Sequence, residues 1–277
     1  MLLKEIEAFL EEDVGHEDYE EIVPDVECEA EIRVKENGVL AGLDEVKQIF
    51  DYLGILYATD FEDGARIKEG DVVLRVRGAG MKILKAERLV LNFLGRMSGI
   101  ATLTARFVEE ARRANARIRV AGTRKTTPGF RKYEKKAIAI AGGDPHRFGL
   151  YEAVIIKDNY IKLMGLENAI KSAKEKVSFT RKIEVEVESI EDALKAAELG
   201  VDIIMFDNMS ARDVKAGVQL LEERGFRSGT GSGLILEASG EINLSNVSEF
   251  AATGVDVLSS GMLTYGAKWL GFSLDVV

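Results

Sequence analysis

The stretch from Lys182 to Asn208, KIEVEVESIEDALKAAELGVDIIMFDN, decides the fold class of this chain. It contains an apolar strand pattern, a helical pattern and a second apolar strand pattern in direct succession. Ser189 and Asp192 have the spacing of a capping box at a helix start, and Gly200 follows the end of that helix. A strand, a helix and a second strand in this order predict two parallel strands joined by a right-handed crossover.

The alternation of strand and helix continues on both sides of this stretch. Further apolar strands are predicted within residues 117–122, 153–159, 233–240 and 255–261. Strands of this kind are buried on both faces, so six or seven such units favour a (β/α) barrel over an open sheet. Because no GxGxxG motif follows the first strand, the sequence disfavours a dinucleotide-binding fold.

In the first hundred residues the predicted elements follow a different order, in which α and β patterns are mixed. Alternating stretches at 30–42 and 70–80 predict strands, and Gly-containing turn signals separate them. A long helical pattern begins at Lys85, with an interruption expected near Gly99. This part of the chain therefore predicts a mixed α/β region ahead of the barrel.

The composition excludes several classes of protein. A formal net charge of −10 and a pI near 5.0 disfavour nucleic-acid binding, which depends on Lys and Arg at phosphates. No apolar run approaches the roughly 18 residues of a membrane helix. With Cys28 as the sole cysteine and two histidines, the chain excludes an intrachain disulfide and Cys- or His-rich metal sites, and a reducing, cytoplasmic location is expected. The scarcity of Gln beside abundant Glu and Lys leans towards a thermophile.

Positive charge is concentrated in GTRKTTPGFRKYEKK, residues 122–136, which contains six Lys or Arg. In an acidic chain, such a cluster predicts a site for a small polyanion. The residues that carry chemistry in a (β/α) barrel lie at the carboxyl ends of its strands. Those ends carry Thr123, Arg124 and Lys125, then Lys157, Glu186, Asp207, Ser239-Gly240 and Ser260-Gly261.

Carboxylates at one of these strand ends follow a period of two. Glu184, Glu186 and Glu188 share one face of the strand, and they point into the barrel if the intervening valines pack against helices. An ionised carboxylate in such a place needs a partner. Lys157 is the expected partner, and Mg²⁺ is the ion expected for an oxygen ligand set that includes Asp207.

Two further features point to the same site. The Ser-Gly turns after the last two strands predict a phosphate site in which backbone N–H groups approach the anion. His146 and Arg147 lie in the loop GGDPHRFGL, residues 142–150, and are expected beside the basic stretch. Together these features predict a site for a substrate with several negative charges and a phosphate compound bound to a metal.

These motifs resemble, in order, the motif series of the quinolinate phosphoribosyltransferase family: TRKTTPGFRKYEKKA, GGDPHRFGL, IIKDNYI, IEVEVES, FDN, EASGEI and GVDVLSSGMLT. AERLVLNFLGRMSGIAT resembles the helix that precedes them in that family, and the similarity extends from about Asp63 to the C-terminus. The resemblance implies an α/β fold with an N-terminal α/β sandwich domain, residues 1–100. It also implies an incomplete (β/α) barrel of about seven parallel strands, residues 101–265, with segment 266–277 returning to the first domain.

The resemblance implies a reaction as well as a fold. Phosphoribosyl pyrophosphate and quinolinate would react, with Mg²⁺, to nicotinate mononucleotide, pyrophosphate and CO₂ in de novo NAD biosynthesis. Quinolinate has two adjacent carboxylates, so the basic stretch would bind a small anion through bidentate Arg–carboxylate pairs. By the family pattern, the quinolinate pocket is lined by Arg124, Lys125, His146, Arg147 and Lys157, and Thr123 is also expected to bind substrate.

The family pattern assigns the remaining residues too. Lys125 and Lys157 are catalytic together with Glu186 and Asp207, which also lie near the ribose and Mg²⁺. The phosphate turns contain Ser239, Gly240, Ser260 and Gly261. Arg88 matches an arginine that reaches the site of the neighbouring subunit, which implies an obligate homodimer and allows a hexamer made of dimers.

The sequence departs from the family at Tyr160 and Tyr265, where histidine is usual. Neither tyrosine is among the residues assigned to chemistry. Two alternatives stay open, namely a related phosphoribosyltransferase that uses another base such as nicotinate, and a non-enzymatic barrel that binds phosphorylated ligands. The crowding of cations favours a dicarboxylate over nicotinate, and the inward carboxylates disfavour a pure anion binder.

Overall fold

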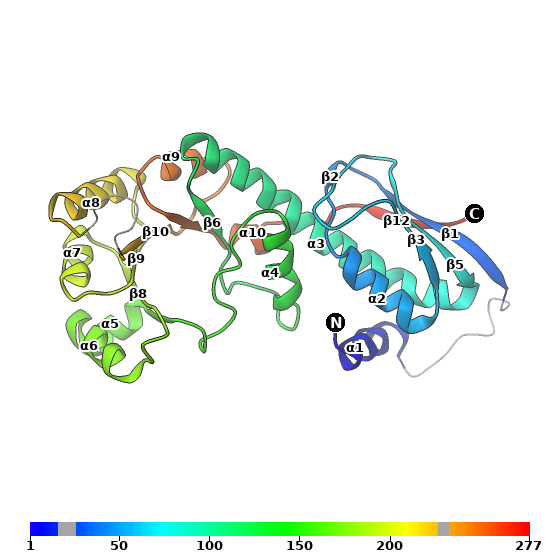
Figure 1. Ribbon diagram of the computed structural model, residues 1–277, viewed down its shortest axis with the longest axis horizontal. Coiled ribbons are helices and arrows are strands. Elements are labelled where there is room, and N and C mark those ends of the chain that lie inside the picture. Colours follow the sequence, from blue (N-terminus) through cyan, green and yellow to red (C-terminus); the bar gives the residue numbers. More distant parts are fainter. Residues whose placement is uncertain (16–25, 227–232) are drawn as a thin grey trace. The chain divides into compact units, whose positions relative to one another are not determined.

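The computed structural model describes residues 1–15, 26–226 and 233–277 (Figure 1). The chain forms two compact units, and the division between them falls within helix α3 (Gly80–Ala114). The first unit comprises Met1–Leu103, Lys136–Ala141 and Ala267–Val277, and the second comprises Thr104–Lys135 and Gly142–Gly266. In the described part of the chain, no helix combines the length and apolar character that crossing a membrane requires.

The first unit is built on an antiparallel sheet with the strand order β12-β1-β5-β3. Ala30 of the first strand lies opposite both Val76 and Val276, so the C-terminal segment completes this sheet. Helices α1 (Leu3–Val14) and α2 (Leu43–Leu53) belong to the same unit. Its strands are β1 (Glu27–Val34), β2 (Gly38–Val39), β3 (Leu56–Ala58), β4 (Arg66–Ile67), β5 (Val72–Ala79) and β12 (Phe272–Val276).

Helix α3 continues through Gly99, so the interruption predicted there is wrong. A Cβ atom at Gly99 would collide with the carbonyl of Lys268. One turn earlier, the N–H of Leu270 donates to the carbonyl oxygen of Gly95 at 3.0 Å. Glycine is required here because the C-terminal segment lies directly against the helix, and it does not mark a kink.

The second unit contains six parallel strands in the order β6-β11-β10-β9-β8-β7. The strands are β6 (Arg119–Ala121), β7 (Val154–Ile156), β8 (Ile183–Val187), β9 (Ile203–Asp207), β10 (Ile235–Ser239) and β11 (Val257–Ser259). All six lie within the stretches that the sequence predicted, and the fold class is confirmed. Its helices are α4 (Arg131–Ile140, which crosses the division), α5 (Asp158–Met164), α6 (Leu166–Lys176), α7 (Ile190–Glu198), α8 (Ala211–Glu223), α9 (Val247–Ala251) and α10 (Met262–Tyr265).

The sheet of the second unit is open between β6 and β7, which form its two edges. The described residues therefore supply six strands, where about seven were predicted. Asp144 makes an isolated parallel bridge with Ala121 at this opening, but the ladder goes no further. Pro145 follows directly, and a proline has no N–H to donate to a ladder.

Alternation along β8 determines which side chains face the interior of the sheet. Val185 and Val187 are almost fully buried, and Glu184 on the opposite face is buried as well. In Figure 1, helices α6, α7 and α8 lie outside the strands of this unit. The Ser189 hydroxyl accepts the N–H of Asp192 at 3.1 Å, so Ser189 caps the start of α7 at the predicted position.

Candidate active site

A cavity of about 630 Å³ opens at the carboxyl ends of the six strands. Every strand contributes a residue within it or directly after its end. Arg88 lies outside the cavity, and all the other residues that the sequence assigned to the site line it. Those residues are Thr123, Arg124, Lys125, His146, Arg147, Lys157, Glu186, Asp207, Ser239, Gly240, Ser260 and Gly261.

Lys157 and Glu186 form an ion pair on the wall of the cavity. Their side chains keep 40% and 13% of their surface exposed, so the pair is only partly desolvated. Burial raises the pKa of Glu186, and the hydrogen bond and charge of Lys157 act against that shift. Burial also raises the pKa of Asp207, against the charges of Lys157 and Lys125. The nearby cations offset part of the cost of burying these carboxylates, and Lys157 is the partner of Glu186 that the sequence predicted.

Arg147 is the most deeply buried cation of the cavity, with 8% of its surface exposed. Its guanidinium donates to the carbonyl oxygen of Ala153 at 2.7 Å. Burial lowers the pKa of Arg147, the neighbouring Arg124 lowers it further, and Glu184 and Glu186 act in the opposite direction. Two guanidinium groups close enough to repel each other provide a place where an anion would be stabilised.

The Ser-Gly turn after β10 has a tightly constrained backbone. Gly240 has a φ of +95°, and a Cβ atom there would contact the backbone of Asn208. The N–H of Asn208, itself at a φ of 54°, donates to the carbonyl oxygen of Ser239 at 3.0 Å. This conformation favours glycine, and it leaves the backbone beside the cavity without a covering side chain.

The Ser-Gly turn after β11 is held from two sides. The Ser260 hydroxyl donates to the carbonyl oxygen of Ile242 at 2.6 Å. The Thr264 hydroxyl donates to the carbonyl oxygen of Lys125, also at 2.6 Å. A Cβ atom at Gly261 would collide with the ring of Tyr265. Both turns thus fit close approach by an anion, as expected for a phosphate site.

Comparison with known proteins identifies the family. The profile described as "Quinolinate phosphoribosyl transferase, C-terminal domain" matches residues 100–275, and the corresponding N-terminal domain profile matches residues 16–98. This chain belongs to the quinolinate phosphoribosyltransferase family. The resemblance in its motifs is therefore confirmed.

The relatives match over nearly their whole length. The probable nicotinate-nucleotide pyrophosphorylase (carboxylating) of Archaeoglobus fulgidus is 51% identical, over 92% of this chain and 96% of that protein. The human nicotinate-nucleotide pyrophosphorylase (carboxylating) is 37% identical, over 98% of this chain and 90% of that one. The crystal structure of NadC from Streptococcus pyogenes is 38% identical and superposes with a TM-score of 0.89, covering 99% of this chain and 96% of that one.

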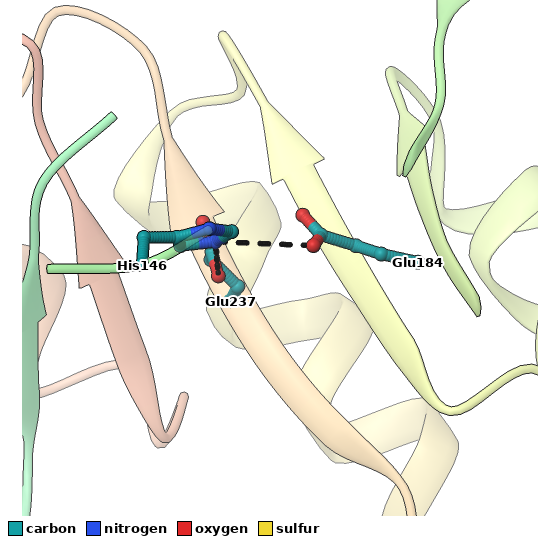
Figure 2. Close-up of side chains that lie close together, drawn as sticks. All are labelled: His146, Glu184 and Glu237. Carbon is teal, nitrogen blue, oxygen red and sulfur yellow. Dashed lines mark hydrogen bonds and ion pairs between the residues drawn. The ribbon is translucent and has the colours of Figure 1, made fainter. Parts of the chain in front are cut away.

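Three side chains form a cluster that the sequence did not predict as a group: His146 and Glu237, which line the cavity, and Glu184, which does not. Figure 2 shows His146 between the carboxylates of Glu184 on β8 and Glu237 on β10. The His146 Nε2 atom lies 3.4 Å from Glu237 Oε2 and 3.8 Å from Glu184 Oε2. Glu184 and Glu237 expose 1% and 2% of their surface. We call His146, Glu184 and Glu237 the deep cluster.

The Glu184 carboxyl is strongly affected by its burial. Neither of its carboxylate oxygens has a hydrogen-bond partner among the described residues. Burial and the charge of Glu237 raise the pKa of Glu184 to about 8. At neutral pH the Glu184 side chain is therefore largely a neutral acid, because an unpaired buried carboxylate is costly.

The deep cluster has the composition of a metal site, since one ligand atom from each residue lies within 4.8 Å of the others. The histidine nevertheless has the wrong hydrogen bonding for a ligand. His146 Nδ1 accepts the N–H of Arg147 at 2.8 Å, so a neutral ring carries its proton on Nε2. A metal-bound histidine donates through its second ring nitrogen instead. We therefore assign the deep cluster to hydrogen bonding, with Nε2–H donating to Glu237.

Two opposing influences act on His146 itself. Burial lowers the pKa of His146, but the hydrogen bond to Glu237 and the charges of Glu237 and Glu184 outweigh it, so the pKa is raised. A second ring proton would sit on Nδ1, where its N–H would face the N–H of Arg147. The Arg147 amide therefore favours the neutral ring, whereas Glu237 and Glu184 favour the charged one.

Glu237 could have been found in the sequence. It precedes Ser239 by two residues in a predicted strand, so it shares the inward face with that serine. Glu188, by contrast, was expected inside the barrel and is exposed, because β8 ends at Val187. The alternation that orients side chains holds only as far as the strand continues.

Three other family positions have clear places. Arg88 is exposed on α3 in the first unit. Tyr160 exposes 52% of its surface on α5, and Tyr265 exposes 61% while lining the cavity. The two departures from the family pattern are therefore surface residues, and Tyr265 alone of the two is at the cavity edge.

Proposed function

We propose that this protein transfers the phosphoribosyl group of phosphoribosyl pyrophosphate to quinolinate, with loss of CO₂. The products are nicotinate mononucleotide and pyrophosphate, and the reaction belongs to NAD biosynthesis (EC 2.4.2.19). Membership of the family supports this activity. The observation that carries it is one cavity lined by four cations, Arg124, Lys125, Arg147 and Lys157. A base with one carboxylate would leave part of this charge uncompensated.

The cations would bind and orient the dicarboxylate. Arg124 and Arg147 suit the two carboxylates of quinolinate, because a guanidinium matches a carboxylate with two parallel hydrogen bonds. Lys125, Lys157 and His146 would complete the pocket. A ring held in this way would present its nitrogen to the ribose carbon of the second substrate, and positioning of two reactants is a large part of catalysis.

Glu186 and Asp207 would act on the other substrate. Positive charge develops on the ribose carbon as pyrophosphate leaves, and nearby carboxylates stabilise it. These residues also fit Mg²⁺, since both supply carboxylate oxygens to the cavity, and burial raises the pKa of each, a cost that a cation would offset. Bound Mg²⁺ would neutralise charge on the leaving pyrophosphate.

The substrate supplies most of the remaining chemistry. The pyridine nitrogen attacks the ribose carbon, and the bond to pyrophosphate breaks. The resulting pyridinium stabilises the carbanion that forms when the 2-carboxylate leaves as CO₂, and that ring carbon then takes up a proton. No covalent intermediate with the enzyme is needed, so the protein's work is positioning and electrostatic stabilisation.

The test is to offer the purified protein phosphoribosyl pyrophosphate and Mg²⁺ with either quinolinate or nicotinate. We expect equal amounts of CO₂ and pyrophosphate with quinolinate and neither product with nicotinate. Lys125→Ala should lose this activity while keeping its fold. Pyrophosphate from nicotinate alone would contradict the assignment of the base, and binding without turnover would favour the non-enzymatic alternative.

We also propose that the enzyme is a homodimer in which Arg88 enters the partner's site. Support comes from the exposure of Arg88 and from a cavity whose lining lies entirely in the second unit. Mixing Arg88→Ala with Lys125→Ala tests this arrangement. Hybrid dimers would contain one intact site, so activity should return after the two inactive variants exchange subunits. A mixture that stays inactive after proven exchange would overturn the shared site.

A further inference from the structure

The segment from Asp144 to Phe148 carries two of the cavity residues on an irregular backbone. His146 has a φ of 55°, in the left-handed region that a side chain rarely adopts. The His146 N–H donates to Asp144 Oδ1 at 2.8 Å, and the Asp144 N–H donates to the carbonyl oxygen of Val120 at 2.8 Å. Such a conformation persists where its surroundings hold it from several sides. These two bonds fix the Asp144 end of the segment, and further contacts fix its Phe148 end.

Helix α4 supplies two cations to this segment, one helical turn apart. Arg131 Nη1 donates to the carbonyl oxygen of Phe148 at 3.0 Å. Lys135 Nζ donates to the carbonyl oxygen of Pro145. Residues four apart in a helix lie on the same face, so both cations reach the segment from the same side. The carbonyl oxygens that they hold flank His146 and Arg147 directly in the chain.

Lys135 is an unusual residue for this task, because none of its surface is exposed. Its ammonium also lies 5.4 Å from the centre of the Phe148 ring, within range of a cation–π interaction. Lysine is almost never fully buried unless its charge is satisfied. The Lys135 ammonium is satisfied by the carbonyl oxygen of Pro145 and the ring of Phe148, so its charge acts on this segment.

We propose that Lys135 is a positioning residue, whose buried ammonium holds the Pro145–Phe148 segment so that His146 and Arg147 keep their places against the cavity. The inference rests on the proposed function, in which those two residues bind quinolinate. Lys135 itself does not line the cavity and would not touch the substrate. Its loss would displace the base-binding side of the site and leave the phosphate turns unchanged.

The charges around Lys135 come from four parts of the second unit. Burial, then the charge of Arg131, lowers the pKa of Lys135 to about 8, with Arg124 acting in the same direction. Glu152 and Asp144 oppose this shift, and Lys135 in turn lowers the pKa of His146. The ammonium is therefore lost at a mildly alkaline pH, and a neutral amine makes a weaker hydrogen bond to a carbonyl.

The first test compares Lys135→Met with Lys132→Met. Both replace a lysine of α4 by a residue of similar length, and Lys132 is exposed and outside the cavity. We expect Lys135→Met to raise the KM for quinolinate about tenfold to 100-fold, because small displacements of binding groups have effects of this size. The KM for phosphoribosyl pyrophosphate should change less than about twofold, and Lys132→Met should match the wild type.

The two KM values separate positioning from a purely structural role. A structural lysine would lower the melting temperature of Lys135→Met and change neither KM selectively, and that result would overturn the proposal. Turnover of quinolinate by the wild type is measured first. That measurement tests the proposed function, and the comparison with Lys135→Met then tests the positioning role alone. A wild type without activity would refute the function and this inference together.

The second test does not depend on the folding of Lys135→Met. In the wild type, the KM for quinolinate should rise as the pH goes from 7 to 9. Over the same range, the contribution of Lys135 to the free energy of unfolding should also rise. The stability has this sign because the lowered pKa makes the folded state bind fewer protons than the unfolded state above about pH 8. Weaker binding in a more stable protein is not expected of a structural lysine.

Glu184 is the control for this pH profile, because its pKa is also raised to about 8. A rise in the quinolinate KM that persists in Glu184→Gln supports Lys135 as its source. A rise that disappears in Glu184→Gln, or a flat profile in the wild type, would overturn the proposal.

Discussion

Glu184 and Glu186 are the same residue type, two positions apart on one face of β8, yet their surroundings differ sharply. Glu184 belongs to the deep cluster, where it has no hydrogen-bond partner in the described structure and a pKa of about 8. Glu186 lies one step nearer the strand end, at the cavity wall, and pairs with Lys157. Depth along one strand therefore separates a largely neutral acid from a paired anion.

Residue type and orientation therefore do not assign a role by themselves. Both carboxylates face inward, as alternation predicts, but only Glu186 can meet a substrate in the cavity. We expect a change at Glu186 to alter kinetics, and a change at Glu184 to alter stability and its pH dependence.

Glu186→Gln should have the largest effect on catalysis. It removes the carboxylate proposed to stabilise charge on the ribose, so kcat/KM should fall by about 10²–10³, the usual cost of losing one such electrostatic group. Steady-state kinetics measures this. Stability should change little, because burial already raises the pKa of Glu186 and penalises its ionised form.

Glu188→Gln is the matched control for Glu186→Gln. Glu188 continues the same alternating pattern but is exposed beyond the end of β8. Its replacement should leave kcat/KM within about twofold of the wild type, as for most surface changes. Equal losses of kcat/KM in the two variants would mean that any negative charge near the end of β8 is sufficient. The position of Glu186 at the cavity wall would then not matter.

Arg147→Ala should have the next largest effect, and it should be selective for quinolinate. A charged hydrogen bond to a carboxylate contributes about 1.5–3 kcal/mol, so the KM for quinolinate should rise about tenfold to 100-fold. The KM for phosphoribosyl pyrophosphate should hardly change. Arg181→Ala, at an exposed arginine outside the cavity, is the control. A loss of affinity for both substrates would show that Arg147 does not belong to the quinolinate pocket.

Glu184→Gln should alter the pH dependence of stability more than the kinetics at pH 7. The raised pKa means that the folded state binds more protons than the unfolded state between about pH 4.5 and 8. The contribution of Glu184 to stability is therefore present at low pH and is lost as the pH rises through about 8. A neutral Gln has no such loss.

Melting temperatures between pH 5 and 9 measure this effect. We expect Glu184→Gln to gain several °C relative to the wild type across that range, since about 1 kcal/mol corresponds to a few °C in a protein of this size. Parallel curves for the two proteins would mean that Glu184 stays ionised in the folded state. The division of roles between Glu186 and Glu184 would then be wrong.

The sequence predicted the fold and many of the residues that line the cavity because both depend on local patterns. Strands and their ends follow from runs of apolar residues, and Ser239-Gly240 and Ser260-Gly261 directly follow or end such runs. The parallel sheet then brings the carboxyl ends of all its strands to one edge, so residues at these ends lie close together. Gly99 was misjudged because its reason is a contact with Lys268, far away in sequence.

The basic stretch shows what local patterns cannot supply. Arg124 and Lys125 line the cavity, but the cations of α4 have other partners. Lys135 holds the carbonyl of Pro145, and Lys136 pairs with Glu45 at 2.9 Å within the first unit. Which way each helical cation points depends on elements that pack around the helix, and the same limit explains why the pairing of Glu237 with His146 was missed.

Lys162→Ala should have the smallest effect, although it breaks a short ion pair. Lys162 Nζ lies 2.7 Å from Asp158 Oδ2, one helical turn away on α5, and none of the residues of this helix is buried. Water solvates both groups before and after the change, so we expect a melting temperature within about 1 °C of the wild type. Both KM values should also stay within about twofold.

Lys162→Ala tests whether a short contact distance or burial of the side chain decides how much a charged residue contributes. The Lys162–Asp158 pair is as close as a strong hydrogen bond, and Glu184 has no such contact, yet we expect Glu184 to matter more. The Asp158 pKa is lowered mainly by its bond to Lys162, so any contribution of the pair is lost as the pH falls through the pKa of that carboxyl. A change of KM above about threefold would instead make α5 part of the substrate site, and exposure would then be a poor guide to function at the edge of this cavity.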